Sequence, residues 1–238
     1  MVLYVDDILL ATYDLGLLNE TKQFLSRSFD MKDLGEASFV LEIEIKRDRS
    51  RGLLGLSQRS YIESVLKTFN MKDCRPGVAP VVKGDKLSKD QCSKNEVEMR
   101  TMKDVPYASV VGCLMYIQVC TRPDIAFVVN MLGRFSSNPG WAHWVAAKKV
   151  MRYLQCTKDF MLVYKRVDYL DLLVYSDSDF AGCQDTMKST SGYTFMLDGG
   201  AISWKSEKQS ITITSTMEVE FIACFETVSH VLDKEFSY

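Results

Sequence analysis

The stretch from Leu3 to Leu10 constrains the fold more than any other, because two adjacent carboxylates, Asp6 and Asp7, lie between two apolar runs. No Gly or Pro interrupts this stretch, so the simplest structure is a tight β-hairpin with Val5 and Asp6 near its tip. Such a hairpin brings both acids to one exposed end, where they repel each other and favour a bound cation. Paired oxygen ligands suit Mg²⁺, and two Mg²⁺ ions suit displacement at phosphorus. The alternative is a surface turn with two solvated acids.

Composition places the chain among ordinary globular proteins. Its 238 residues are 47% hydrophobic and 25% charged, enough for one large domain or two small ones. The seven cysteines follow no metal-binding spacing, which favours reduced, buried thiols in an intracellular protein over disulfides or zinc. No apolar run approaches the roughly 18 residues needed to span a membrane, and no basic leader precedes the first strand.

Charge is distributed unevenly, although the net charge is only −2. Residues 1–45 are mainly acidic and residues 46–75 mainly basic. An acidic metal site beside a basic surface that grips a nucleic-acid backbone fits a polymerase, whereas two solvated faces are the simpler alternative. The basic residues that we expect to contact nucleic acid here are Lys46, Arg47, Arg49, Arg51 and Arg59.

The residues after the hairpin predict a helix and then a strand. Apolar residues recur at helical spacing over 17–28, which predicts an amphipathic helix packed beneath the hairpin. Alternation of apolar and polar residues over 39–45 predicts a half-buried strand, and Asp48–Gly55 predicts a charged turn. The stretch 74–105 is rich in Pro, Lys, Asp and Ser, which predicts a long connecting loop.

A helix is expected from about residue 60 to Phe69. Ser57 or Ser60 is a candidate cap, and Ser60 with Glu63 has the spacing of a capping box. The helix is basic and amphipathic, so its apolar face is expected to pack in a core.

Three further helices are expected between residues 107 and 155. The first is Tyr107–Val119, in which Gly112 is expected to permit a close approach of another element. Pro123 fits the first turn of the second helix, which continues to about Leu132. After a turn at Asn138–Gly140 a third helix is expected to end near residue 155.

The third of these helices has one apolar and one basic face. Its basic face carries Lys148, Lys149 and Arg152, which are candidate phosphate-contacting residues. His143 lies near its start and has no His, Cys or acid at metal-ligand spacing, so a packing or capping role is expected for it.

From residue 160 the apolar period changes to two, which indicates strands. Asp198-Gly199-Gly200 is a strong tight-turn signal. A helix is expected to begin at Ser215, with Glu218 as its capping partner. The expected strands are Phe160–Tyr164, Leu172–Ser176, Ser191–Leu197, Ala201–Lys205 and Gln209–Thr214.

Several motifs together resemble the polymerase of copia-type LTR retrotransposons, in that family's order and over essentially the whole chain. The first is the Tyr-Val-Asp-Asp hairpin, which resembles the catalytic hairpin of reverse transcriptases. The others are Met31-Lys32-Asp33-Leu34-Gly35, Leu56-Ser57-Gln58, Tyr107-Ala108-Ser109-Val110-Val111-Gly112 and Thr121-Arg122-Pro123-Asp124-Ile125.

The resemblance implies an α+β fold, in which a reverse-transcriptase palm, thumb and connection precede a partial ribonuclease H-like fold. Residues 1–48 would be the end of the palm, with the catalytic hairpin and a primer-grip strand. Residues 49–158 would be the mostly helical thumb and connection, and residues 159–238 the first half of the ribonuclease H-like domain. The family commonly has Gly where Glu42 stands, so this chain places a carboxylate where primer phosphates would pass.

Later motifs resemble the ribonuclease H domain of the same family. They are Tyr175-Ser176-Asp177-Ser178-Asp179, Lys188-Ser189-Thr190-Ser191-Gly192, Gly200-Ala201-Ile202-Ser203-Trp204 and Glu218-Val219-Glu220-Phe221. The resemblance implies that Asp177 and Glu220 are catalytic acids holding Mg²⁺, with Glu218 as a cap and Asp179 at the surface. It also places further acids of both active sites before residue 1 and after residue 238.

The function implied for the parent protein is copying of RNA into DNA, with degradation of the RNA in the hybrid. Asp6, Asp7, Asp177 and Glu220 would hold Mg²⁺ in two two-metal sites. The implied partners are an RNA template, a DNA primer, the RNA–DNA hybrid and deoxynucleoside triphosphates, with no membrane. The implied location is cytoplasmic, particle-associated in the parent, or nuclear. The alternatives are a non-catalytic nucleic-acid-binding remnant and a decayed transposon product without activity.

Overall fold

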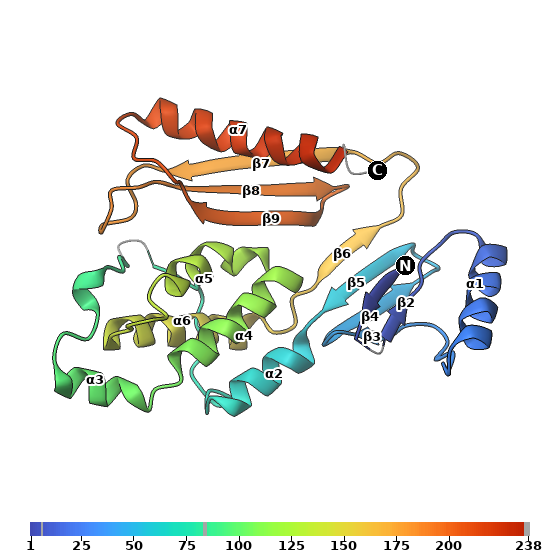
Figure 1. Cartoon of the computed structure of the whole chain (residues 1–238), viewed down its shortest axis with the longest axis horizontal. Helices are drawn as coiled ribbons and strands as arrows, with labels where there is room; N and C mark the ends of the chain where they lie inside the picture. Colours follow the sequence, from blue (N-terminus) through green and yellow to red (C-terminus); the bar gives the residue numbers. More distant parts are fainter. Residues whose placement is uncertain (6, 83–84, 236–238) are drawn as a thin grey trace. The chain divides into compact units, whose positions relative to one another are not determined.

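The computed structural model describes residues 1–5, 7–82 and 85–235. The chain folds into two compact units, which comprise residues 1–41 and 42–238 (Figure 1). None of the helices in the described ranges combines the length and the apolar character that a membrane crossing requires.

The first unit begins with the predicted hairpin. Strand β1 (Val2–Tyr4) pairs antiparallel with β2 (Asp7–Leu9), and Tyr4 lies opposite Asp7. Helix α1 (Leu15–Ser28) confirms the predicted helix but begins two residues earlier, because the carboxylate of Asp14 accepts hydrogen bonds from the first backbone amides of the helix.

The expected packing of α1 beneath the hairpin is wrong. No residue of α1 is buried, and Leu17 and Phe24 are 54% and 65% exposed. The amphipathic pattern therefore predicts the helix correctly but not a partner for its apolar face.

The predicted strand over residues 39–45 is interrupted. It forms β3 (Phe39–Val40) and then β4 (Ile43–Asp48), because Leu41 and Glu42 adopt left-handed backbone angles with φ of 52° and 58°. These angles cost a residue with a Cβ about 1–2 kcal/mol, and a strand cannot continue through them.

The second unit contains an antiparallel sheet in the order β4-β5-β6. Strand β5 is Leu53–Ser57, and β6 (Leu162–Lys165) returns from far along the chain to pair with it. The predicted charged turn over Asp48–Gly55 is present but shorter, because β5 already begins at Leu53; Gly52 lies in the turn with a φ of 63°. The prediction of a strand near residues 160–164 is confirmed, but the strand belongs to this sheet.

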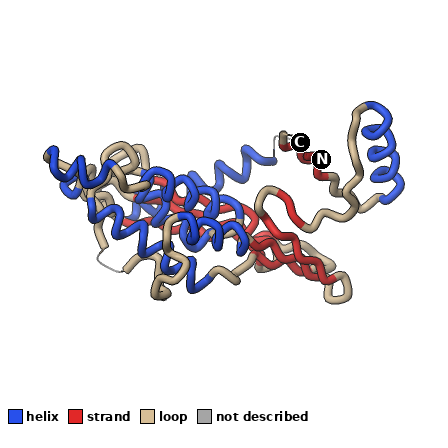
Figure 2. Tube along the Cα trace, turned by 90° about the horizontal axis from the view of Figure 1, so that it is seen from below, coloured by secondary structure: helices blue, strands red, loops and turns tan. Residues whose placement is uncertain are grey.

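The predicted helices of this unit are confirmed and enclose its core (Figures 1 and 2). They are α2 (Arg59–Thr68), α4 (Tyr107–Cys120), the 3₁₀ turn η2 (Pro123–Ile125), α5 (Ala126–Gly133) and α6 (Trp141–Thr157). Their buried aliphatic side chains form one cluster, with Leu114, Ile117, Leu132, Met151 and Leu154 fully enclosed.

Two local predictions within these helices are wrong. A Cβ at Gly112 would meet no atom within 4 Å, so this glycine does not mark a close approach. Ser60 and Glu63 form no capping box, since Glu63 is paired with Arg59 and Lys158, which lower the pKa of its carboxyl group. Ser57 does accept a hydrogen bond from the backbone amide of Arg59, at 3.2 Å.

The prediction of one long loop over residues 74–105 is also wrong. This stretch contains the 3₁₀ turn η1 (Lys89–Gln91) and helix α3 (Glu96–Lys103). The side chain of Asn95 accepts a hydrogen bond from the backbone amide of Glu98, and the carboxylate of Glu98 reaches back to the amide of Lys94. Capping therefore stabilises a short helix whose apolar pattern is weak.

The last part of the unit is a three-stranded antiparallel sheet with the order β7-β8-β9. The strands are Leu172–Asp179, Thr190–Leu197 and Gly200–Lys208, and helix α7 (Thr216–Glu235) follows and contacts β7 and β8 (Figure 1). The sheet also contacts α5 through β9. The predicted strand Gln209–Thr214 is wrong, because Gln209 donates side-chain hydrogen bonds to Ser191 and to the carbonyl of Val219 instead.

All seven cysteines are free, as expected, but only Cys183 is buried, while Cys156 and Cys224 are exposed. His143 has the predicted packing and capping role. It is fully buried, accepts a hydrogen bond from the amide of Gly140 at 2.9 Å and stacks on Phe135, and burial lowers its pKa.

Candidate polynucleotide-processing sites

The first candidate site is the tip of the β1–β2 hairpin. Tyr4 pairs with Asp7, and Val5 lies in the turn between the two strands with a φ of 47°, as tight hairpin turns require. Asp7 is exposed and begins β2. Asp6 lies outside the described residues, so the separation of the two carboxylates stays a prediction.

The second candidate site lies on β7 and α7. The hydroxyl of Thr227 on α7 donates to the hydroxyl of Ser176, so Ser176 faces the helix and Asp177 points to the opposite face of the sheet. Asp177 is exposed and accepts a hydrogen bond from the amide of Ser178. Glu220 is exposed in the second turn of α7. No direct contact between Asp177 and Glu220 is found in the described part of the chain.

Asp179 is expected at the surface, but it is half-buried. Its carboxylate accepts a hydrogen bond from the backbone amide of Thr190 on the neighbouring strand, a contact between strands that the sequence does not reveal. Within residues 1–5, 7–82 and 85–235, no three His, Cys, Asp or Glu side chains are close enough to enclose a metal ion.

The predicted basic residues of the β4–β5 hairpin and α2 have different surroundings. Lys46 is 3.4 Å from Glu44, and both side chains are largely exposed. Arg59 pairs with Glu63 and, at 2.6 Å, with Asp159 beyond the end of α6. Arg47, Arg49 and Arg51 lie in or beside the β4–β5 turn, where they are exposed. Nucleic-acid binding by this group stays a prediction.

The three cations predicted to form a row on α6 also differ in their contacts. Lys149 donates two hydrogen bonds to Asp85 at 2.8 and 2.9 Å, and this contact lowers the pKa of Asp85. Arg152 donates through Nε to the backbone carbonyl of Arg75 at 2.8 Å. Lys148 instead lies over two indole rings. The sequence could not predict the Asp85 contact, because its partner is 64 residues away.

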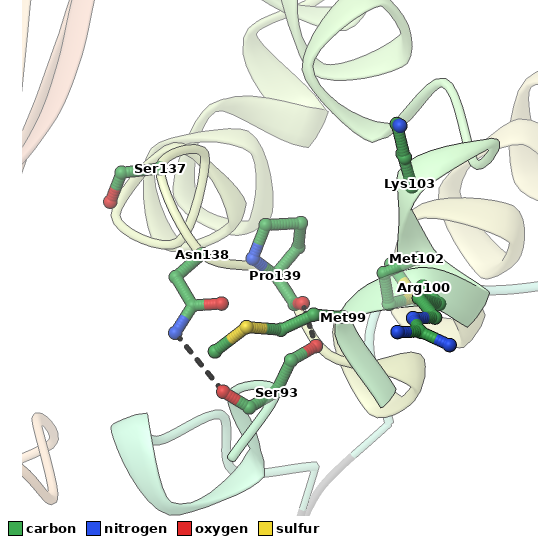
Figure 3. Close-up of a pocket in the computed structure, with 8 residues that line it drawn as sticks. All are labelled: Ser93, Met99, Arg100, Met102, Lys103, Ser137, Asn138 and Pro139. Carbon is green, nitrogen blue, oxygen red and sulfur yellow. Dashed lines mark hydrogen bonds between the residues drawn. The ribbon is translucent and has the colours of Figure 1, made fainter. Parts of the chain in front are cut away.

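A shallow cavity of about 410 Å³ lies between α3 and the segment before α6 (Figure 3). Its lining includes Arg100, Lys103 and Met99 from α3, opposite Ser93 and Asn138. The amide of Asn138 donates to the carbonyl of Ser93, while the Ser93 hydroxyl donates to the carbonyl of Pro139. The lining combines two cations with the apolar side chains of Met99, Met102 and Pro139, but it includes none of the predicted site residues.

The structure contains a buried polar network that the sequence did not predict. Arg122 is 2% exposed and donates to both carboxylate oxygens of Asp124, at 2.9 and 2.7 Å, and to the carbonyl and hydroxyl of Thr157. Tyr153 donates to Asp124 at 2.7 Å. Burial alone would raise the pKa of Asp124, but the contacts with Arg122 outweigh it and the pKa is lowered. The network fixes the junction between α4 and α5 to the end of α6.

Comparisons with known proteins identify the family of the chain. A family model for reverse transcriptase (RNA-dependent DNA polymerase) matches residues 1–83. The chain is 48% identical over 227 residues to the retrovirus-related Pol polyprotein from transposon TNT 1-94 of Nicotiana tabacum, covering 95% of this chain and 17% of that protein. It is 37% identical over 231 residues to the Pol polyprotein from transposon RE1 of Arabidopsis thaliana, covering 97% of this chain and 15% of that protein.

The chain thus spans about one sixth of the length of these Pol polyproteins. An uncharacterised mitochondrial protein of Arabidopsis thaliana matches over nearly its full length, with 35% identity and coverage of 97% of this chain and 92% of that protein. No solved structure matches the chain. The chain therefore belongs to the family of copia-type retrotransposon Pol polyproteins and contains part of the reverse transcriptase domain.

Proposed function

We propose that this chain is a segment of an RNA-directed DNA polymerase in which the β1–β2 hairpin supplies two metal-binding carboxylates, Asp6 and Asp7. The observation that carries the proposal is the hairpin register, in which Tyr4 pairs with Asp7, so Asp7 begins β2 directly after the turn. Adjacent acids on such a turn suit Mg²⁺ ions that orient a nucleoside triphosphate and stabilise the leaving oxygen. The proposed partners are an RNA template, a DNA primer and deoxynucleoside triphosphates.

Metal binding by the chain itself tests this proposal. Mn²⁺ can replace Mg²⁺ at oxygen sites, and it broadens the NMR signals of nearby nuclei. Titration of the full chain with Mn²⁺ should broaden the amide signals of residues 3–9 first, and excess Mg²⁺ should reverse the effect. The double variant Asp6→Asn/Asp7→Asn should lose this broadening, whereas Asp14→Asn should keep it, because this control removes the charge of an acid outside the hairpin while Asn still caps α1. Equal broadening in the wild type and the double variant would refute the assignment.

A catalytic readout separates metal binding from polymerisation. Any template-directed nucleotide incorporation by the chain should require Mg²⁺ and should disappear in Asp6→Asn, because removing a metal ligand costs several kcal/mol of transition-state stabilisation. Incorporation that persists in Asp6→Asn would assign the chemistry to other residues.

We propose ribonuclease H-like cleavage of RNA in a hybrid as a second function, with Asp177 and Glu220 as Mg²⁺ ligands. It is supported by the three antiparallel strands β7–β9 followed by α7. Gln209 links the first turn of α7 to Ser191, which lies opposite Ser178. This link supports a site that combines Glu220, near the start of α7, with Asp177, next to Ser178. Strand β7 is at the edge of its sheet, and the carboxylates of Asp177 and Glu220 are both exposed, so both would be accessible to a metal ion.

Cleavage of a labelled RNA–DNA hybrid tests this second function. Any Mg²⁺-dependent cleavage should be lost in Asp177→Asn and Glu220→Gln and kept in Asp168→Asn, a matched exposed acid in the loop before β7. Cleavage that is unchanged by both site variants would exclude these acids. Binding of the hybrid without cleavage by the wild type would favour a nucleic-acid-binding role.

A further inference from the structure

The outer face of α6 carries an exposed aromatic ring beside cations. Trp141, Val145, Lys148 and Arg152 follow one another at helical spacing, and all four are exposed or half-buried. Trp141 is the most accessible, with 56% of its surface exposed. Eleven residues separate Trp141 from Arg152, which corresponds to about 16 Å along a helix axis.

Lys148 and the tryptophans form one cluster. The ammonium of Lys148 lies 5.3 Å from the ring centroid of Trp141 and 5.5 Å from that of Trp144. Trp144 packs against the buried core of the unit, so it anchors the cluster to the helix bundle. The lysine therefore holds its charge next to an exposed indole instead of extending into solvent.

The charges on this face are not cancelled by acids. Lys149 is neutralised by Asp85, as described above, but it lies outside the stripe. In the described part of the chain, neither Lys148 nor Arg152 forms an ion pair, and the contact of Arg152 is with a neutral carbonyl. An exposed indole flanked by two uncompensated cations complements a ligand that carries both a flat ring and a negative charge.

We propose that this face of α6 binds single-stranded nucleic acid, with one unpaired base stacked on Trp141 and the adjacent phosphates on Lys148 and Arg152. The inference rests on the proposed function, which makes nucleic acid the partner of the chain. Stacking needs a base whose face is free, so a duplex, whose bases are stacked on each other, cannot use Trp141 in this way. The phosphate contacts position the strand without reading its sequence.

Binding of an end-labelled oligothymidylate of about twelve nucleotides tests the inference, because single-strand sites of this kind span roughly 4–16 nucleotides. With the full chain, Trp141→Ala should weaken binding measured by fluorescence anisotropy roughly five- to 150-fold, the equivalent of one lost stacking contact. Trp141→Phe should recover most of the affinity. Tyr169→Ala, which removes a ring that is 89% exposed in the loop before β7, should leave binding unchanged.

Lys148→Met tests the charge separately, because it keeps an aliphatic stem against the two indoles. It should reduce the log–log salt dependence of oligothymidylate binding by about one phosphate contact, a change in slope of roughly 0.7. Stacking should also quench tryptophan fluorescence on binding, and this quenching should be absent in Trp141→Phe even though the variant still binds.

The outcomes separate the inference from the proposed function. If the wild type binds oligothymidylate and Trp141→Ala binds equally well, the stacking site is refuted while nucleic-acid binding stands. If Trp141→Ala weakens a DNA duplex as much as the single strand, the ring acts through folding and the inference also fails. If the wild type binds neither oligothymidylate nor an RNA–DNA hybrid at low salt, both the inference and the proposed partner fail.

Discussion

Replacing Arg122 by Met should destabilise the second unit more than any surface substitution. The guanidinium is enclosed and donates four hydrogen bonds, two to Asp124 and two to Thr157. It also lies 5.5 and 5.6 Å from the ring centroids of Tyr153 and Phe160. Met fills a similar volume, so the substitution removes the charge and the donors while largely preserving packing.

The size of the stability loss depends on the charge of Asp124, which the substitution leaves without a partner. Breaking a buried ion pair costs about 3–5 kcal/mol, because the remaining charge is left without its partner. The side chain of Asp124 is 34% exposed, so water screens part of this cost and the lower end applies. We therefore expect a loss of about 3 kcal/mol from a free energy of unfolding that is typically about 5–15 kcal/mol.

Urea denaturation at neutral pH, followed by circular dichroism and tryptophan fluorescence, measures this loss. With an m-value of about 2 kcal/mol per molar urea, the midpoint should fall by about 1.5 M. Arg100→Met is the matched control, since Arg100 pairs with Glu96 at 3.4 Å on an exposed helix surface and should cost at most about 0.5 kcal/mol.

A double-mutant cycle completes the test. Arg122→Met combined with Asp124→Asn should be less destabilising than the sum of the two single changes, with a coupling of about 1–3 kcal/mol. Arg122→Lys should also lose stability, because an ammonium cannot reproduce the fork that reaches both partners. A loss below about 1 kcal/mol in Arg122→Met, or additivity in the cycle, would show that the network does not hold this junction.

The remaining predictions concern backbone strain, helical glycines and pH. Glu42→Gly should raise the free energy of unfolding by about 1 kcal/mol in urea titrations, since Gly accepts a φ of 58° without strain; a lower value would mean that the Glu42 side chain offsets the strain. Gly112→Ala should stabilise α4 by about 0.5–1 kcal/mol, because the added Cβ meets no atom. Gly140→Ala should cost about 1–3 kcal/mol, because the added Cβ would lie 1.8 Å from the carbonyl oxygen of Gln91. Urea midpoints equal to that of the wild type would contradict both expectations. Asp85 has its pKa lowered by Lys149, so its contribution should be complete above about pH 4 and lost as the pH falls through its folded value; acid titrations of Asp85→Asn should lack this component.

The sequence predicts those parts of the fold that depend on local patterns. The helices α2, α4, α5 and α6 follow from apolar spacing, and the β1–β2 hairpin follows from two short apolar runs on either side of adjacent acids. Strands β8 and β9 follow from alternation on either side of the Asp198-Gly199 turn, and the structure confirms that turn. In each case the residues that form the sequence pattern and the backbone hydrogen bonds of the predicted element are close together in the chain.

The errors come from competing interactions that the pattern does not contain. Alternation over 39–45 is broken by two left-handed residues, neither of which is a glycine. Gln209, Ile211 and Ile213 alternate like a strand, yet the amide of Gln209 is bound to Ser191 and the backbone groups form no ladder. Helix α3 has little apolar periodicity and exists because Asn95 caps it.

The basic face of α6 shows how such non-local contacts change a functional prediction. Lys148, Lys149 and Arg152 look equivalent in sequence, but only the surroundings of Lys148 are local, since its two tryptophans lie four and seven residues before it. The partner of Lys149 is 64 residues away and that of Arg152 is 77 residues away. A salt-dependence slope counts the phosphates that a cation neutralises, and a lysine already bound to a carboxylate releases few counterions from nucleic acid. Helix α6 should therefore contribute about two phosphate contacts, from Lys148 and Arg152, where the sequence alone predicts three.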